Sequence, residues 1–117
     1  MLPNSARIKS SADFARVTKS GRRVTTESLV AYLLIEPSKT KSHESKLGLI
    51  IGKTIGNSVV RHRIARQVRH ASFELLNTLP IGSMLVIRAM KRPSDAFNET
   101  KELFEKIIKI TDSKVSA

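Results

Sequence analysis

The sequence predicts one domain of the α+β class, and three observations support this. The chain has 117 residues, the usual length of one domain, and 40% of them are hydrophobic, which is enough to form a core. Three apolar runs predict strands, and three stretches that follow a capping residue predict helices. Neither a repeat nor a linker interrupts them. We therefore expect a single domain over residues 1–117, with a flexible arm at 1–9 and a flexible tail at 111–117.

The N-terminal half predicts a short helix followed by strands. Ser10 or Ser11 can cap this helix, and Gly21 can end it. Two apolar runs predict buried strands, and a short strand is expected before them. These three strands are expected at 22–25, 29–35 and 46–52.

The C-terminal half predicts a long central helix, another strand and a last helix. Asn57 or Ser58 can cap the central helix, and Ser94 can cap the last one. These elements are expected at 57–77, 84–90 and 94–110. In the last helix the apolar residues fall on one side and most Glu and Lys on the other, which is typical of a helix that packs on a core.

The charge is strongly positive and unevenly distributed. Lys and Arg number 21 against 10 Asp and Glu, a net charge of +11. Residues 1–92 hold 17 of the basic and 5 of the acidic residues, whereas residues 93–117 hold 4 and 5. The densest stretch, 53–69, has five basic residues and no acidic one. This pattern indicates a polyanionic partner, with nucleic acid ahead of an anionic membrane surface.

Composition and motifs exclude several other classes. There is no cysteine, so disulfides, thiolate zinc sites and thiol nucleophiles are excluded. Neither a secretory signal nor an apolar stretch of membrane-spanning length is present, and we expect a cytoplasmic protein. His43, His62 and His70 form no metal spacing or catalytic constellation, and paired carboxylates, a P-loop and a hydrolase elbow are missing. The chain alone is therefore not expected to catalyse a reaction.

The central helix is the unusual element of the sequence. Its apolar residues cluster within roughly 80° of the helix circumference, which suits packing on a sheet. They are Val60, Ile64, Val68, Ala71 and Leu75. The basic side chains spread over roughly 200° of the other side. They are Arg61, His62, Arg63, Arg66, Arg69 and His70.

The residue types on this helix favour phosphate as the ligand. The planar guanidinium of arginine can bind two phosphate oxygens at once. Asn57 and the free N–H groups at the helix start could add an anion site. Basic helices that bind membranes usually carry Trp or Phe on their apolar side, but this one carries small β-branched residues. A membrane partner is therefore not expected.

Residues 52–69, GKTIGNSVVRHRIARQVR, resemble the signature of the protein subunit of bacterial ribonuclease P. That signature has a Lys, a Gly-Asn pair and an Arg-Asn-Arg core followed by further basic residues. The resemblance extends to the segments at 7–9, 13–14, 20–21 and 47–49, the strand around Tyr32, and the closing strand and helix. It implies a two-layer α-β-β-β-α-β-α sandwich with a four-stranded sheet and a long basic central helix.

The resemblance also implies a function and a set of site residues. The chain would be a component of an endoribonuclease that removes the 5′ leader from precursor tRNA. The RNA subunit would hydrolyse the substrate with Mg²⁺, without a further protein partner. The side chains that face this RNA would be Lys53, Asn57, Arg61, His62, Arg63, Arg66 and Arg69. Phe14 and Tyr32 would line a groove for the single-stranded leader.

Three positions depart from the family pattern. His62 replaces the middle Asn of the signature, Ala65 stands where many members have a basic residue, and Thr18 stands where a second groove aromatic is frequent. Phe14 could also be a core residue. The alternative function is that of a structural RNA-binding protein of ribosomal type. An aromatic groove for single-stranded RNA, separate from the basic helix, would favour ribonuclease P.

Overall fold

The computed structural model describes residues 7–8, 10–35, 45–79 and 82–116, the last six of them by their backbone alone. Helices and strands follow the order α-β-β-β-α-β-α, which confirms the predicted order. They are α1 (Ser11–Ser20), β1 (Arg22–Thr25), β2 (Leu29–Ile35), β3 (Lys46–Ile50), α2 (Ser58–Leu75), β4 (Ser83–Ala89) and α3 (Ala96–Ser116). Two short 3₁₀ turns, η2 (Lys53–Ile55) and η3 (Leu76–Thr78), flank α2.

The four strands form one mixed sheet in the order β1-β2-β4-β3. The β1–β2 and β2–β4 pairs are antiparallel, and the β3–β4 pair is parallel. Parallel neighbours need a crossover connection, and α2 supplies it between β3 and β4. This topology places α2 over the sheet rather than at its end.

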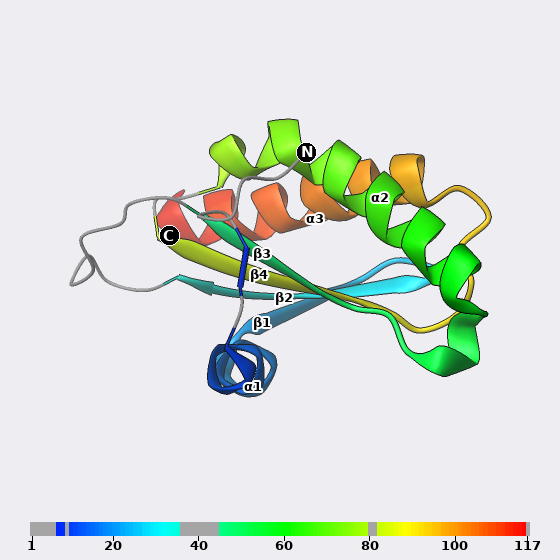
Figure 1. Ribbon diagram of the computed structural model, residues 1–117. Helices are drawn as coiled ribbons and strands as arrows, with labels where there is room; N and C mark the ends of the chain where they lie inside the picture. Colours follow the sequence, from blue (N-terminus) through cyan, green and yellow to red (C-terminus); the bar gives the residue numbers. More distant parts are fainter. Residues whose placement is uncertain (1–6, 9, 36–44, 80–81, 117) are drawn as a thin grey trace.

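The helices divide between the two faces of the sheet (Figure 1). α2 and α3 cover one face and α1 lies on the other. The sheet with α2 and α3 is the predicted sandwich, and α1 adds a helix to the opposite face. The main core lies under α2 and α3, where Leu85, Ile87 and Phe104 are fully buried.

A second, smaller core lies under α1. Val17 of α1 packs there with Met84 and Val86 of β4 and with Ile8. The backbone N–H of Ile8 donates to the carbonyl oxygen of Leu47 at 2.9 Å, so this short segment runs beside β3. Residues 7–8 of the predicted arm are therefore attached to the sheet, whereas 1–6 and 9 lie outside the described residues.

The helix starts test the predicted capping residues. The hydroxyl of Ser10 accepts from the N–H of Ala12 at 3.1 Å, as predicted for α1. The prediction that Ser94 caps α3 is wrong, because Asp95 Oδ1 accepts from the N–H of Asn98 at 3.1 Å. The backbone of α3 is helical to Ser116, beyond the predicted end near residue 110.

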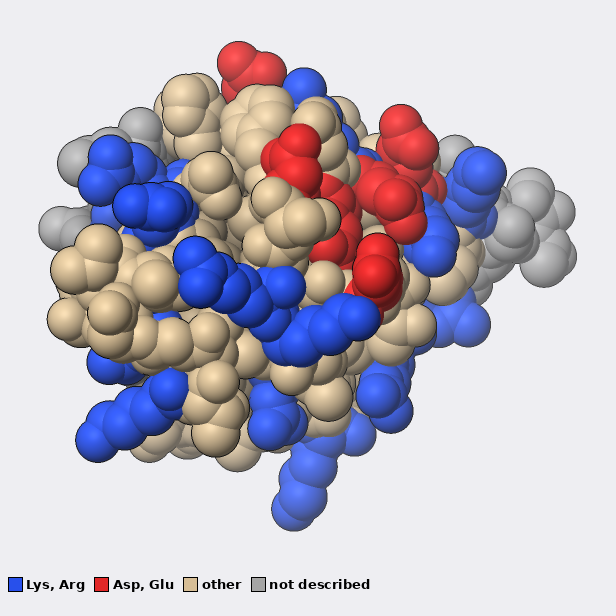
Figure 2. Space-filling view, turned by 90° about the vertical axis from the view of Figure 1, so that its right-hand side faces the viewer, with Lys and Arg blue, Asp and Glu red and all other residues tan. Residues whose placement is uncertain are grey.

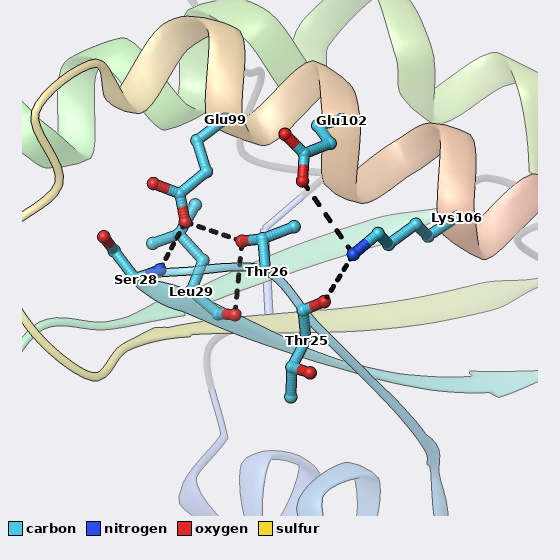
Figure 3. A network of polar contacts seen from close by, with 7 residues as sticks. All are labelled: Thr25, Thr26, Ser28, Leu29, Glu99, Glu102 and Lys106. Carbon is cyan, nitrogen blue, oxygen red and sulfur yellow. Dashed lines mark hydrogen bonds and ion pairs between the residues drawn. The ribbon is translucent and has the colours of Figure 1, made fainter.

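α3 is joined to the β1–β2 turn by a polar network (Figure 3). Oε2 of Glu99 accepts from the backbone N–H of Ser28 and from the hydroxyl of Thr26, both at 2.6 Å. Nζ of Lys106 donates to the carbonyl oxygen of Thr25 at 3.1 Å and pairs with Glu102 at 3.8 Å. Charged residues on the polar side of α3 therefore serve the fold.

Candidate nucleic-acid interface

α2 begins at a closely packed turn. Oδ1 of Asn57 accepts from the N–H of Val60 at 3.0 Å, so this side chain caps the helix. A Cβ atom at Gly56 would lie 2.8 Å from Cγ1 of Val60, so the close contact needs glycine. Lys53 lies exposed in η2, just before this turn. The structure therefore gives Asn57 a capping role and leaves its amide nitrogen as the group that could reach RNA.

The basic residues of α2 differ in how far they extend into solvent. His62, Arg63 and Arg66 are exposed, whereas Arg61 and Arg69 are half-buried. Nε of Arg61 is buried and has no hydrogen-bond partner among the described residues. Within the basic surface that the helix wheel predicts opposite the apolar stripe, Arg61 and Arg69 are therefore more covered than His62, Arg63 and Arg66. A helix wheel shows only the residues of the helix itself. It cannot show that the side of the fold at β3 covers one flank of α2.

Two adjoining hollows lie along this flank, and we call them together the α2 groove. The larger hollow, about 600 Å³, is lined by Arg7, His62, Arg66, Arg69, His70, Phe73 and Glu74. The smaller, about 220 Å³, is lined by Leu49, Ile51, Arg61, His62, Ala65 and Arg69. His62 and Arg69 belong to both hollows, whereas Arg63 lines neither. The groove thus brings four of the predicted residues together, namely Arg61, His62, Arg66 and Arg69, and adds Arg7.

Cationic groups are crowded in the α2 groove. Burial and the neighbouring charge of Arg7 lower the pKa of Arg69 from its ordinary value. Nε of Arg7 is buried without a hydrogen-bond partner among the described residues. Glu74 is the one acidic residue that lines the groove within the described part of the chain. Such a surface is suited to an anion with several oxygens.

The face of the sheet beside α1 carries the predicted groove aromatics. Register places Arg23, Tyr32, Val86 and Gly48 in one row across the four strands. The ring of Phe14 lies over this row, since a Cβ atom at Gly48 would be 2.5 Å from Cε1 of Phe14. Phe14 and Tyr32 are half-buried in the same small cluster. The structure therefore brings the two rings to one face, and Phe14 also packs on the core.

Thr18 lies one turn after Phe14 on the same helix. Its hydroxyl donates to the backbone carbonyl oxygens of Phe14 at 3.0 Å and Ala15 at 3.1 Å. This side chain is half-buried and its hydroxyl is bonded within the helix. It adds no ring to the sheet face.

Two exposed arginines on this sheet face were not among the predicted residues. Arg23 stands beside Tyr32, and Arg88 stands beside Val30 in the next row of the same face. Side chains alternate between the faces of a strand, but alternation alone could not have placed these residues with Tyr32, because the register between β1, β2 and β4 is also needed. Cationic and aromatic groups together are typical of surfaces that bind single-stranded nucleic acid.

Basic side chains dominate one face of the molecule. Figure 2 shows Lys and Arg over much of that face, with most of the acidic side chains in the view close together. The described residues contain no group of three or more His, Cys, Asp or Glu side chains placed to hold a metal ion. In the part of the chain that the structure describes, every helix is too short or too polar to cross a membrane.

The fold and these two surfaces define a small α+β protein of the nucleic-acid-binding class. The family model described as Ribonuclease P matches residues 2–112. The chain therefore belongs to the ribonuclease P protein family, and it is a protein subunit of ribonuclease P that acts in tRNA processing.

Relatives and solved structures agree with this assignment. The ribonuclease P protein component of Mycobacteroides abscessus is 39% identical over 101 residues, 84% of this chain and 80% of the relative. That of Acidothermus cellulolyticus is 34% identical and covers 99% of this chain and 97% of the relative. The Staphylococcus aureus RNase P protein superposes with a TM-score of 0.69 at 26% identity, covering 91% and 94% of the two chains. The Thermotoga maritima protein, at 20% identity and a TM-score of 0.60, covers 88% of each chain and shows the same fold.

Proposed function

We propose that this chain binds the RNA subunit of ribonuclease P through α2 and the 5′ leader of precursor tRNA through the sheet face beside α1. The single observation that carries this proposal is the presence of two separate surfaces on opposite faces of one sheet. One is the cationic surface of α2, and the other carries Phe14, Tyr32, Arg23 and Arg88. Two surfaces allow the chain to bind two segments of RNA at once.

The α2 surface suits a folded RNA. Its contacts would be mainly to phosphates, because arginines dominate the surface and helical RNA presents its backbone outward. Lys53, Arg63 and Arg66 are exposed and free to reach this backbone. His62 can donate a hydrogen bond or stack on a base in place of the signature Asn.

The sheet face suits a single strand. Unpaired bases can stack on the exposed parts of Phe14 and Tyr32, while Arg23 and Arg88 contact phosphates of the same strand. Thr18 supplies no ring, so fewer bases can stack here than in relatives with an aromatic at this position. This arrangement favours ribonuclease P over a structural RNA-binding protein of ribosomal type.

The chemistry of hydrolysis is assigned to the RNA subunit. Mg²⁺ would be held mainly by that RNA, since most side chains of both surfaces are cationic or aromatic and a single carboxylate, Glu74, does not suit a hard dication. The role of this chain is to bind the RNA subunit and position the leader, and its positive charge relieves phosphate repulsion. We place this activity in the cytoplasm, without a membrane or a second protein.

Co-purification tests the proposal. The native protein is isolated with its bound RNA, and that RNA is sequenced. We expect one structured RNA of a few hundred nucleotides, which cleaves precursor tRNA at lower Mg²⁺ when the chain is added. The RNA-free protein should cleave nothing. Recovery of ribosomal RNA fragments, or cleavage by the RNA-free protein, would contradict the proposal.

A further inference from the structure

On the basis of the function proposed above, we propose that the larger hollow of the α2 groove binds one unpaired nucleotide of the RNA subunit. The base lies against Phe73, and the phosphate lies among Arg7, Arg66 and Arg69. This nucleotide pocket is distinct from the leader-binding face, which lies on the other side of the sheet.

The first argument concerns the phosphate. Arg66 and Arg69 come from α2, whereas Arg7 comes from the segment beside β3, so the cations converge from two parts of the chain. The Nε–H donor of Arg7 is buried and finds no acceptor within the described residues. A phosphate supplies acceptors for such donors and relieves the repulsion between Arg7 and Arg69.

The second argument concerns the base. The chain has four phenylalanines, and the side chain of Phe73 is 46% exposed to solvent. Its ring lines the same hollow as the three arginines, together with the rings of His62 and His70. A base stacked on Phe73 would remove this apolar surface from water.

The third argument concerns size and shape. The hollow of about 600 Å³ falls within the range of small-ligand sites and accommodates a nucleotide. A base inside an RNA duplex is stacked on both sides and is not available to a protein ring. The occupant must therefore be a nucleotide turned out of the helical stack, in a bulge, a loop or a strand end.

Two substitutions at Phe73 distinguish stacking of a base on the aromatic ring from simple apolar contact. Phe73→Leu keeps an apolar side chain without a π face, whereas Phe73→Tyr keeps the π face. We expect Phe73→Leu to bind the RNA subunit roughly 5- to 100-fold more weakly, the effect of losing one stacked base. Phe73→Tyr should bind like the wild type. The salt dependence should not change in either variant, because no charge is removed. Met90→Leu, at an exposed residue that lines neither hollow, is the matched control.

A fluorescent variant gives a readout that does not depend on affinity. The chain has no tryptophan, so Phe73→Trp introduces a single reporter. We expect its emission to be quenched when the RNA subunit binds, and that of Met90→Trp to stay unchanged. If Phe73→Leu binds the RNA subunit as tightly as the wild type, or Phe73→Trp is not quenched in the complex, the pocket is disproved while the proposed function stands. Failure of the wild-type chain to bind this RNA would instead disprove the proposed function and the pocket with it.

Discussion

α2 and α3 pack side by side on one face of the sheet, yet their polar sides are built differently. Each helix buries an apolar stripe, with Ile64 and Val68 from α2 and Phe104 from α3. On α3, Glu99 and Lys106 hold the β1–β2 turn. On α2 the polar side has no acidic residue before position 74. The comparison shows that covering this sheet does not require the arginines of α2.

The arginines of α2 have an energetic cost to the fold. Arg63 and Arg66, and Arg66 and Arg69, are three residues apart on the helix and repel one another by a few tenths of a kcal/mol per pair. The mixed charges of α3 avoid this cost, as in the Glu102–Lys106 pair. This contrast supports the proposal that the polar side of α2 serves RNA binding, whereas the polar side of α3 serves the fold.

The largest expected effect is on the core below α3. Phe104→Ala should lower the free energy of unfolding by about 3–5 kcal/mol, because the side chain is fully buried and leaves a cavity. Chemical denaturation measures this loss. Phe73→Leu on α2 is the control and should cost less than about 1 kcal/mol, since that ring is half exposed. Equal losses at the two positions would remove the contrast between the helices.

A smaller effect is expected from the polar side of α3. Glu99→Ala removes the acceptor for the buried Ser28 N–H and should cost roughly 1–3 kcal/mol of stability. The exposed Glu105 on the same helix is the control, and Glu105→Ala should change stability by less than about 0.5 kcal/mol. Thermal melts of both variants test this. A stable Glu99→Ala variant would show that the network in Figure 3 contributes little to the fold.

Substitutions on the sheet face beside α1 should change leader binding without involving the polar sides of α2 and α3. Tyr32→Leu should weaken binding of leader-bearing precursor tRNA to the holoenzyme by about 1–3 kcal/mol, because a base loses its stacking partner. Thr18→Phe should strengthen the same binding, because it adds a ring on which a base can stack. Neither variant should alter binding of mature tRNA, which has no leader. Phe14→Ala should cost stability as well, because its ring packs over Gly48. Equal changes for precursor and mature tRNA would exclude this face as the leader site.

The sequence predicts the elements well because their signals are local. The strand at 29–35 follows from an apolar run and is confirmed. Capping chemistry leaves two candidates at each of two helix starts, Ser10 or Ser11 and Asn57 or Ser58, and the structure uses Ser10 and Asn57. Ser94 and Asp95 are both good capping residues, so local chemistry could not choose between them.

Features that depend on strand pairing could not be predicted from the sequence. Arg23 and Arg88 share a face with Tyr32 only because β1, β2 and β4 are neighbours in this register. The larger hollow of the α2 groove needs Arg7 beside β3, about 60 residues from the α2 positions that complete it. A helix wheel contains neither kind of information.

The most direct test of the central claim measures stability and RNA binding in one pair of double variants. Arg63→Ala/Arg66→Ala removes two exposed cations from α2, and Lys101→Ala/Lys109→Ala removes two from α3. For the α2 pair we expect unchanged or slightly higher thermal stability, and a log–log salt slope for RNA-subunit binding that is shallower by about 0.7–0.9 per arginine. The α3 pair should leave that slope unchanged. An unaltered slope in the α2 pair, or the same change in both pairs, would contradict the assignment of α2 to RNA binding.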